Sequence, residues 1–451
     1  MIAIVGAGIT GLAAAHELAI RGAPFRVIEA ASRPGGLIYT EHANGFTIEA
    51  GPDAVLAQKP AALALCHELG LAPRIISTTP PRTAFVLKRG HLHPLPSPSI
   101  LGIPLTTRAI ARYDLLPAAA RARLVLEPFV SAGTAADESV GAFFRRRFGG
   151  ATVDLIAAPL LGGIHAGDIH ALSLRSLVPR FAEAEARDGS VLRAFARTQR
   201  PGGDGLFRSL SSGMGELVSS IERRLPAGSI QYDSPVERLV RHGSIRRIAA
   251  GGTVTDARVV ILAAPAPVAA RLLAPFDDHA AALCADVPYV STVSVALAYP
   301  RGDVAHPLEG SGFVVARRYN DLRITACTWV SSKWSGRAPA GHVLLRAFIG
   351  GAHDPEAINV SDERLIDIAW REIGGVLGIT QEPAMARVYR WRNAGAQHNV
   401  GHLARMGALE RRLAELPGML VAGSGFRSIG IPDCVADGRA AGAAAAHAIG
   451  L

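Results

Sequence analysis

The sequence predicts an α/β fold in which a parallel sheet with covering helices is assembled from separated segments and carries two insertions. The chain opens with a short apolar strand, a glycine-rich turn and a helix. Strand-and-glycine segments of the same kind return within 206–279 and 383–451. The stretches between them differ, because one has short helical patterns and the other has strand-like runs. At roughly 150 residues per domain, the length of 451 residues also suggests about three units.

The composition indicates a globular protein. Hydrophobic residues make up 49% of the chain and charged residues 19%, which allows a sizeable core and excludes disordered and fibrous classes. The net charge is +9, and only Lys59, Lys88 and Lys333 among the 47 basic residues are lysines. The arginines are scattered and do not cluster beside aromatic side chains, which argues against nucleic-acid binding. The densest arginine run, 145–147, is predicted to be a solvated helix face.

Cysteine spacing and hydropathy indicate the cellular setting. The four cysteines, at 66, 284, 327 and 434, form no CxxC pair, so we expect no metal site, no disulfide framework and a reducing cytoplasm. The chain begins directly as a strand, without the pattern of a signal peptide. No window reaches about 18 uninterrupted apolar residues, so no spanning helix is expected, whereas a monotopic contact with the inner face of the cell membrane stays open.

The N-terminus carries a dinucleotide-binding fingerprint. A strand over 2–5 runs into Gly6-Ala7-Gly8-Ile9-Thr10-Gly11 and a helix, and a second strand over 25–28 ends at Glu29. Gly6 permits the tight turn, Gly8 lets the backbone approach a pyrophosphate, and Gly11 lets the helix pack closely on the strand. The helix N-terminus offers free N–H groups and a positive dipole to the phosphates, and Glu29 can accept hydrogen bonds from a ribose.

A second glycine turn favours FAD over NAD. Arg33-Pro34-Gly35-Gly36 follows Glu29 closely and resembles the second signature of the flavoprotein superfamily that contains amine oxidases, phytoene desaturases and protoporphyrinogen oxidases. The two glycines are expected to bring backbone close to the flavin phosphates, and Arg33 either pairs with these phosphates or caps the turn. The family pattern usually has a basic residue after the glycine doublet. This chain has Leu37 there, so only its backbone is carried over.

The later segments complete a Rossmann-like FAD-binding domain, predicted over 1–80, 206–279 and 383–451. Buried strands are expected over 258–265 and 419–425, followed by a small-residue helix over 439–449, with Gly430, Ile431 and Pro432 as flavin contacts. The insertion 93–205 is predicted to be a helical lobe with many apolar positions. An α+β substrate-binding domain is predicted from 81–92 and 280–382, with strands over 290–299, 312–316, 324–330 and 342–349 and a helix over 362–377.

Blocks along the whole chain resemble the bacterial protoporphyrinogen oxidases and coproporphyrinogen III oxidases of haem biosynthesis. They are Leu160-Leu161-Gly162-Gly163-Ile164-His165-Ala166-Gly167-Asp168 with 172–175, Gly51-Pro52-Asp53 with Lys59-Pro60, and the runs 326–329, 331–334, 398–403 and 430–434. The resemblance implies non-covalent FAD, held by Gly6, Ala7, Gly8, Ile9, Thr10, Gly11, Glu29, Ala30, Arg33, Gly36, Leu37, Gly51, Pro52, Asp53, Ala54, backbone at Val236 near the adenine, Trp391 beside the isoalloxazine, Ile429, Gly430 and Ile431. The family often has Met-Pro-Gln-Tyr where this chain has Gly-Ala-Gln-His at 395–398, which leaves the contacts of those side chains open.

The resemblance implies the removal of six electrons from a porphyrinogen, taking protoporphyrinogen IX to protoporphyrin IX. Hydride would pass to flavin N5, and dioxygen would reoxidise the flavin and yield hydrogen peroxide. Coproporphyrinogen III, which would give coproporphyrin III, is the alternative substrate. Asp53 and Lys59 are candidates for a role near the flavin and a substrate carboxylate. No proton acceptor is assigned, and His165 and His402 are expected to be hydrogen-bonded structural residues.

Two other functions compete with this one. A flavin amine oxidase is disfavoured because 423–428 lacks the cysteine through which monoamine oxidases often attach FAD, and a non-catalytic FAD-binding module is disfavoured by the intact fingerprint and both insertions. The apolar positions of the helical lobe resemble the membrane-associating lobe of protoporphyrinogen oxidases. Peripheral membrane contact, hand-over of the product to a ferrochelatase and a monomeric or homodimeric state are therefore further expectations.

Overall fold

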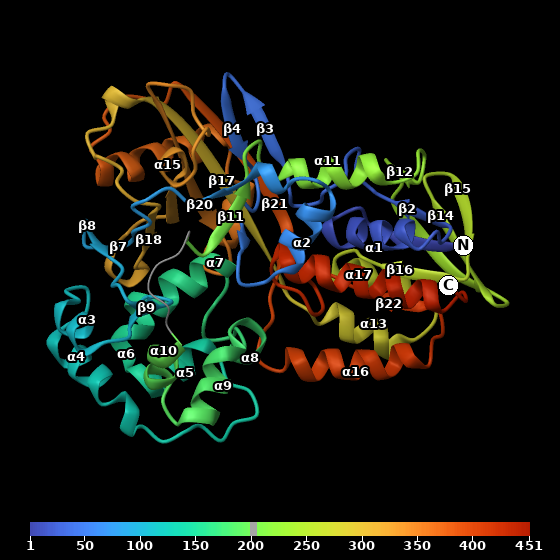
Figure 1. Cartoon of the computed structure of the whole chain (residues 1–451), viewed down its shortest axis with the longest axis horizontal. Helices are drawn as coiled ribbons and strands as arrows, with labels where there is room; N and C mark the ends of the chain where they lie inside the picture. The colour runs from blue at the N-terminus through green and yellow to red at the C-terminus, as the bar shows by residue number, and fades with distance from the viewer. Residues whose placement is uncertain (199–204) are drawn as a thin grey trace.

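The computed structural model describes residues 1–198 and 205–451, and residues 199–204, near the end of the predicted lobe 93–205, lie outside the described part. Figure 1 shows three parts: a layered α/β part that holds both chain termini, a second sheet covered by a helix, and a lobe of short helices. The predicted α/β fold class is therefore present, with two different units set beside the layered part.

A parallel sheet of five strands forms the centre of the layered part. Its order is β12-β2-β1-β16-β22, and every neighbouring pair is parallel. The strands are β1 (Ile2–Val5), β2 (Phe25–Ile28), β12 (Ile230–Gln231), β16 (Val259–Leu262) and β22 (Met419–Val421). Strands on the two sides of β1 run in opposite sequence order, so its carboxyl end is the switch point at which sheets of this type bind ligands.

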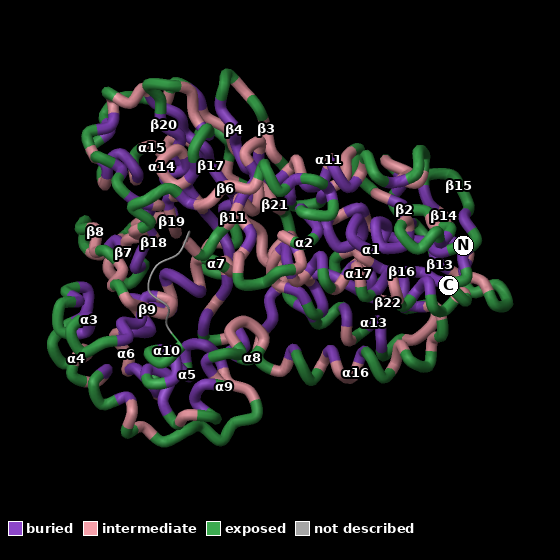
Figure 2. Tube along the Cα trace, viewed as in Figure 1, coloured by how far each residue is buried: buried purple, intermediate pink, exposed green. Residues whose placement is uncertain are grey.

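Both faces of this sheet are covered, which explains why its strands are almost continuously apolar. Ile2 and Ile4 face one hydrophobic core, whereas Ala3 and Val5 face another on the opposite side. The first core includes α1 (Ile9–Ile20), α2 (Ala61–Glu68), α11 (Gly215–Arg224) and α17 (Ile431–His447). The second includes the antiparallel strands β13 (Val236–His242), β14 (Ile245–Ala250) and β15 (Thr253–Ala257) with α12 (Ala266–Leu273), α13 (Asp278–Ala285) and α16 (His402–Ala414). Figure 2 shows this buried interior along α1 and β16.

The last helix begins earlier than the sequence predicts. The prediction places a helix over 439–449, whereas α17 begins at Ile431 and ends at His447. Pro432 lies in the first turn, where its missing N–H costs no hydrogen bond, and the Asp433 carboxylate accepts from the N–H of Gly430 at 3.4 Å. The sequence interpretation treated 430–438 as the segment that leads into the helix, whereas residues 431–438 already form its first two turns.

The second sheet has seven strands in the order β21-β17-β20-β19-β18-β7-β8, antiparallel except between β18 and β7. The strands are β7 (Ala84–Lys88), β8 (His91–Pro94), β17 (Tyr289–Pro300), β18 (Gly312–Val315), β19 (Ile324–Trp329), β20 (His342–Gly350) and β21 (Met385–Ala396). The helix α15 (Asp362–Leu377) packs on it with the bounds that the sequence predicts. β21 lies in the range assigned to the FAD-binding domain, but it pairs with β17, because strand partners are set by tertiary contacts that the local sequence does not carry.

Residues 95–198 form a lobe of short helices around an aromatic core, whereas residues 93 and 94 of the predicted lobe end β8 of the second sheet. The rings of Phe143, Phe144, Phe148, Phe181 and Phe195 pack with centroids 5.1 to 6.3 Å apart. The helices are α3 (Thr107–Arg112), α4 (Ala118–Val125), η2 (Glu127–Phe129), α5 (Val140–Phe148), α6 (Gly150–Thr152), η3 (Val153–Gly162), α7 (Gly163–His165), α8 (Leu174–Leu177), α9 (Pro179–Asp188) and α10 (Val191–Thr198). The π-helix η3 leads directly into α7, and such wide helical turns often occur at functional sites.

The arginine run of α5 corrects a prediction. Arg145 is exposed as expected, but Arg147 is fully buried and pairs with Glu127, whose side chain is also fully buried. Arg146 pairs with Glu185 at 2.7 Å. Only Arg145 therefore lies on a solvated face, whereas Arg146 and Arg147 pair with acidic residues from distant segments, which sequence spacing does not reveal.

Smaller elements connect these parts. They are the hairpin β3 (Thr40–Ala43) and β4 (Phe46–Glu49), the three-stranded sheet of β5 (Val55–Leu56), β11 (Phe207–Leu210) and β6 (Ile75–Ser77), the pair β9 (Ser99–Ile100) and β10 (Ile103–Pro104), and the short helices η1 (Ala72–Arg74), η4 (Arg301–Asp303), η5 (Arg317–Tyr319), α14 (Val330–Lys333) and η6 (Pro355–Asn359). The four cysteines are free and buried. Within residues 1–198 and 205–451, we find no helix with the length and apolarity needed to cross a membrane.

Candidate flavin site

The first glycine turn places the N-terminus of α1 at the switch point. Gly6 has a φ of 101°, and a Cβ on it would lie 2.6 Å from the carbonyl oxygen of Ala263. A Cβ on Gly11 would lie 1.9 Å from the carbonyl oxygen of Gly6. A Cβ on Gly8, by contrast, would meet no atom of the described chain within 4 Å, and α1 has no side-chain cap there. The uncapped helix N-terminus therefore faces open space that a phosphate can occupy.

Glu29 is held beside this turn by the backbone. Its Oε2 accepts from the N–H of Ala7 at 2.6 Å, and its Oε1 accepts from the N–H of Ala31 at 2.8 Å. Each carboxylate oxygen can accept more than one hydrogen bond. Glu29 therefore keeps acceptor capacity for ribose hydroxyls, as the sequence predicts. Ala30, another predicted flavin contact, lies between Glu29 and the Ala31 N–H that Glu29 binds.

The second glycine turn packs on the first. Gly35 forms an isolated parallel bridge with Gly8, and its N–H donates to the carbonyl oxygen of Ala7 at 2.8 Å. A Cβ on Gly36 would lie 3.3 Å from the Cα of Gly8. Arg33 donates to the carbonyl oxygen of Gly36 at 2.9 Å. Of the two roles that the sequence suggests for Arg33, the structure therefore shows the cap of the turn.

The segment 51–54 meets these turns from the side of the second sheet. A Cβ on Gly51 would lie 1.9 Å from the carbonyl oxygen of Leu37, so only glycine allows this approach. Trp391 of β21 donates from Nε1 to the carbonyl oxygen of Ala50 at 3.0 Å. A Cβ on Gly51 would lie 3.6 Å from Cζ2 of the Trp391 ring. The structure thus brings together the predicted flavin contacts at 36–37, 51–54 and 391.

A buried ion cluster anchors this segment. The Asp53 carboxylate, 13% exposed, lies 2.9 Å from Lys333 Nζ and 3.4 Å from Arg346 Nη2, and it accepts from Trp334 Nε1 at 3.1 Å. Burial alone would raise the pKa of Asp53, but the charges of Lys333 and Arg346 and the hydrogen bonds from Lys333 and Trp334 hold it well below its usual range. Arg346 also donates to the carbonyl oxygen of Gly51 at 2.9 Å. Asp53 is therefore a largely buried, ionised anchor of this segment.

Glu49 and Arg337 extend the cluster. The fully buried Arg337 guanidinium lies 3.6 Å from the Glu49 carboxylate, which also accepts from Thr40 Oγ1 at 2.7 Å. Burial raises the pKa of Glu49 in spite of these partners. The sequence interpretation missed the roles of Glu49, Arg337 and Arg346. The one available signal was the block 331–334, which contains Lys333 and is separated from Asp53 by 280 positions.

Lys59 lies at the N-terminus of α17. Its Nζ is 2.6 Å from the Asp433 carboxylate, and its side chain is 47% exposed. The same carboxylate accepts from the N–H of Gly430 at 3.4 Å. Lys59 is therefore positioned beside the predicted flavin contacts Gly430 and Ile431, with Ile429 immediately before them.

Val236 begins β13 and is buried. It pairs with Ala250, and a register shift follows before Arg238. Its carbonyl oxygen accepts from Arg271 Nη2 at 2.9 Å. The backbone group that the resemblance places near the adenine therefore already has one partner on its oxygen, and a carbonyl oxygen can accept a second hydrogen bond.

Two histidines brace the segment that leads to α17. The rings of His398 and His402 stack with centroids 3.8 Å apart and planes 12° apart. Nε2 of His398 donates to the carbonyl oxygen of Ser424 at 2.8 Å, and Nε2 of His402 donates to that of Phe426 at 2.6 Å. Burial, assisted by the neighbouring ring, lowers the pKa of His402 to about 4. The contacts of His402 are therefore those of a hydrogen-bonded structural residue. His165 is half-buried, and the loss of water around its ring lowers its pKa to about 4.

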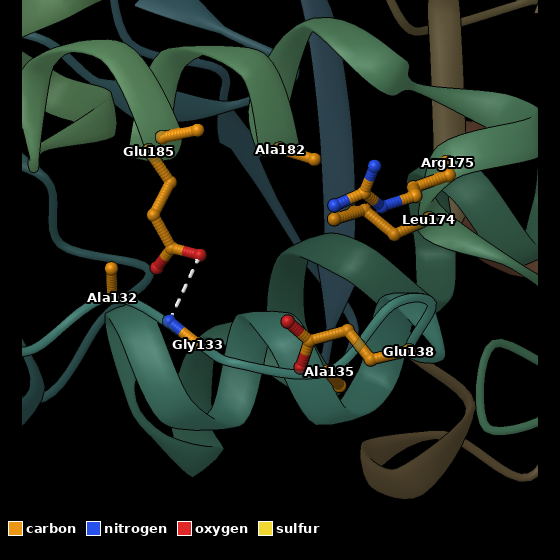
Figure 3. Close-up of a pocket in the computed structure, with 9 residues that line it drawn as sticks. Ala132, Gly133, Ala135, Glu138, Leu174, Arg175, Ala182 and Glu185 are labelled. Atoms are coloured by element: carbon orange, nitrogen blue, oxygen red, sulfur yellow. Dashed lines mark hydrogen bonds between the residues drawn. The ribbon is translucent and has the colours of Figure 1, made fainter.

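The lobe holds a separate cavity of about 50 Å³, lined in part by Glu138, Arg175 and Glu185 (Figure 3). The Glu185 carboxylate accepts from the N–H of Gly133 at 3.3 Å and belongs to the ion network of Arg146. Ligand pockets typically have roughly 300–1,000 Å³. This cavity is therefore too small for a cofactor or a macrocycle.

Comparison with known proteins decides the family. Residues 9–446 match the family described as flavin containing amine oxidoreductases. The chain belongs to this family. The fold class and the flavin cofactor predicted from the two glycine turns are thereby confirmed.

Relatives along nearly the whole chain carry porphyrinogen oxidase names. The coproporphyrinogen III oxidase of Bacillus subtilis is 36% identical, covering 98% of this chain and 96% of that protein, and that of Mycobacterium tuberculosis H37Rv is 33% identical, covering 97% and 95%. The chloroplastic protoporphyrinogen oxidase of Nicotiana tabacum is 27% identical, covering 96% and 83%. A solved structure from Exiguobacterium sp. 255-15, named for protoporphyrinogen oxidase, has a TM-score of 0.89 at 31% identity and covers 98% of both chains. The family resemblance stated from the sequence blocks is confirmed.

Proposed function

We propose that this flavin amine oxidoreductase family member is an FAD-dependent oxidase that converts coproporphyrinogen III into coproporphyrin III. The full-length similarity to the Bacillus subtilis coproporphyrinogen III oxidase carries the proposal. The sequence alone placed protoporphyrinogen IX first and coproporphyrinogen III as the alternative. Seven relatives at 29–36% identity carry the coproporphyrinogen name, so we reverse this order and keep protoporphyrinogen IX as the second candidate.

FAD would be held non-covalently between the two glycine turns. The open space at Gly8 suits the pyrophosphate, Glu29 suits a ribose, and backbone at Val236 suits the adenine. Trp391 and the N-terminus of α17 at Gly430 would border the flavin ring. When bound, the flavin accepts a hydride from the substrate and is reoxidised by dioxygen to give hydrogen peroxide. Three such rounds remove six electrons and consume three molecules of dioxygen for each porphyrin formed.

The chain itself supplies positioning and charge. Lys59 is nearly half exposed at the N-terminus of α17, where its ammonium group can attract a substrate carboxylate. Asp53 is paired with Lys333 and Arg346, so its carboxylate is a weak base and is unsuited to accept a substrate proton. We therefore propose Lys59 for substrate binding and Asp53 for anchoring the segment 51–54, with the second sheet as the substrate-binding domain and the layered part as the FAD-binding domain.

The decisive experiment compares turnover of coproporphyrinogen III and protoporphyrinogen IX in the same detergent. We expect porphyrin fluorescence and oxygen uptake with both, and a larger kcat/KM for coproporphyrinogen III. A larger value for protoporphyrinogen IX would favour the second candidate. Anaerobic bleaching of the bound flavin by amines, with no bleaching by either porphyrinogen, would overturn the proposal.

We also propose a peripheral contact of the lobe with an anionic membrane surface. Val125, Leu126 and Phe129 are 48%, 55% and 80% exposed at the end of α4 and in η2, close to Arg121 and Arg123 in sequence. Exposed apolar side chains beside basic residues are typical of interfacial anchors. This contact would place the protein, as a monomer or homodimer, at the inner face of the cell membrane. The metal-free porphyrin would pass from the protein there to a ferrochelatase.

Flotation with anionic liposomes tests this contact. We expect Phe129→Ser to reduce the bound fraction. Val254→Ser changes a valine that is 64% exposed on β15 in the layered part, so it serves as the control and should leave binding unchanged. Equal binding of all three proteins would contradict the proposed anchor.

A further inference from the structure

Two of the three lysines of the chain lie beside the candidate flavin site. Lys88 is on β7, whereas Lys59 and Lys333 neighbour the predicted flavin contacts. Lys333 Nζ lies 2.9 Å from Asp53, 5.2 Å from the ring of Trp334 and 5.7 Å from the ring of Phe207. Its side chain is 15% exposed. A lysine ammonium is thus held at a largely buried position in a chain in which 44 of the 47 basic residues are arginines.

The cluster around Lys333 has more positive than negative charge. It contains three cations, Lys333, Arg337 and Arg346, and two carboxylates, Glu49 and Asp53, joined by contacts of 2.9, 3.4 and 3.6 Å, so that 3 − 2 leaves +1. Several guanidinium nitrogens, namely Nε and Nη1 of Arg337 and Nε of Arg346, are buried without a hydrogen-bond partner in the described part of the chain. The positive charge is therefore not fully compensated inside the protein.

This cluster directly contacts the backbone that faces the candidate site. Arg346 donates to the carbonyl oxygens of Glu49 at 2.7 Å and Gly51 at 2.9 Å. Trp391, the predicted neighbour of the flavin ring, donates to the carbonyl oxygen between them, that of Ala50. The charge is therefore placed immediately behind the segment 50–53. Charges act over longer distances in such a poorly hydrated interior than in water.

We propose that this net positive charge raises the reduction potential of the bound flavin, with Lys333 as the cation that sets it. The inference rests on the proposed function, since it requires a flavin at the two glycine turns. A flavin that takes up two electrons as a hydride becomes an anion unless it gains a further proton. Positive charge held nearby stabilises that reduced form more than the neutral oxidised form.

Two variants of the same ion pair separate this electrostatic effect from a structural one. Lys333→Met removes a positive charge and should lower the potential, whereas Asp53→Asn removes a negative charge and should raise it. We expect each variant to change the equilibrium constant between the bound flavin and a reference redox dye about tenfold. One neighbouring charge shifts a pKa by a similar factor. For a two-electron couple, a tenfold change in the equilibrium constant corresponds to about 30 mV in reduction potential. Lys333→Arg keeps the charge and should stay within a factor of about two of the wild type.

The matched control is an exposed ion pair in the layered part. Arg247 and Asp256 lie 3.0 Å apart on β14 and β15, and Arg247→Gln and Asp256→Asn should leave the dye equilibrium unchanged. Shifts of the same sign in both Asp53→Asn and Lys333→Met, or shifts no larger than those of the controls, would overturn the proposal. If Asp53→Asn does not fold, Lys333→Met and Lys333→Gln provide the test alone. A reduction potential that is unchanged or raised in these two variants would then contradict the proposed effect of Lys333.

The proposed function can fail separately. If the wild-type protein binds FAD but oxidises neither porphyrinogen, the dye equilibria still confirm or refute the effect of Lys333. If porphyrinogen turnover is observed and the potentials do not move in opposite directions, the function stands and the electrostatic inference is wrong. A purified protein unable to bind FAD would refute both.

Discussion

A Cβ on Gly438 of α17 would lie 2.1 Å from the carbonyl oxygen of Thr10 in α1. The two helices thus touch at the backbone, and one turn later a Cβ on Gly442 would lie 2.8 Å from the carbonyl oxygen of Ala14. Both helices begin at the candidate flavin site, α1 at the first glycine turn and α17 at Gly430. Their close packing therefore fixes the relative position of the two ends of the proposed cofactor site.

Gly438→Ala should destabilise the protein, because the added methyl group forces the two helices apart. We expect a loss of about 2 kcal/mol in the free energy of unfolding, measured by urea denaturation. Gly375→Ala in α15 is the control, since a Cβ there meets nothing within 4 Å of the described chain. It should leave stability unchanged or raise it by up to about 1 kcal/mol. Equal losses in the two variants would contradict a tight contact at Gly438.

Gly8→Val should separate flavin binding from folding. The side chain would project into open space in the apoprotein, and Gly8 has a φ of −64°, which valine can adopt. We therefore expect the free energy of unfolding without FAD to change by less than about 0.5 kcal/mol. FAD binding should weaken strongly, because the same space is proposed for the pyrophosphate. Titration of the apoprotein with FAD measures this, and unimpaired binding would place the phosphates elsewhere.

Arg147→Met and Arg145→Met should differ sharply although the residues are two positions apart. Removing Arg147 leaves Glu127 buried without its cation, so we expect a loss of about 3–5 kcal/mol. Arg145 is exposed, and its removal should change stability by less than about 0.5 kcal/mol. Thermal and urea denaturation of both variants would test the corrected assignment of this run. Comparable small effects would restore the solvated face that the sequence predicts.

The sequence predicted those parts whose constraints are local. The turn from Gly6 to Gly11 and the carboxylate of Glu29 follow one another within a single strand-helix-strand unit, and the bounds of α15 follow from its amphipathic period. These features were recognisable because each is specified by neighbours in the chain.

The features that the sequence did not predict depend on distant partners. Asp53 and Lys333 are 280 positions apart, and Arg147 and Glu127 come from separate helices. β21 becomes part of the second sheet only through its pairing with β17. Such contacts follow from the tertiary fold, so a charged residue looks alike in the sequence whether it is solvated or buried.

The stacked pair of His398 and His402 should make stability depend on pH. The pKa of His402 is about 4 in the folded protein, against an ordinary value of 6.5, because burial disfavours the charged ring. The folded state therefore binds fewer protons than the unfolded state between these values, so stability is fully present above pH 6.5 and is lost as the pH falls towards 4. From the shift of His402 alone we expect a loss of about 2 kcal/mol between pH 7 and pH 5.

His402→Gln should reduce this pH dependence. The glutamine amide can still donate a hydrogen bond to the carbonyl oxygen of Phe426, but it does not titrate, so the difference in unfolding free energy between pH 7 and pH 5 should shrink by about 2 kcal/mol. His91→Gln, at an exposed position on β8, should keep the wild-type dependence. Urea denaturation at both pH values measures the two differences. An equally steep loss in His402→Gln would show that the neutral pair does not carry the pH dependence.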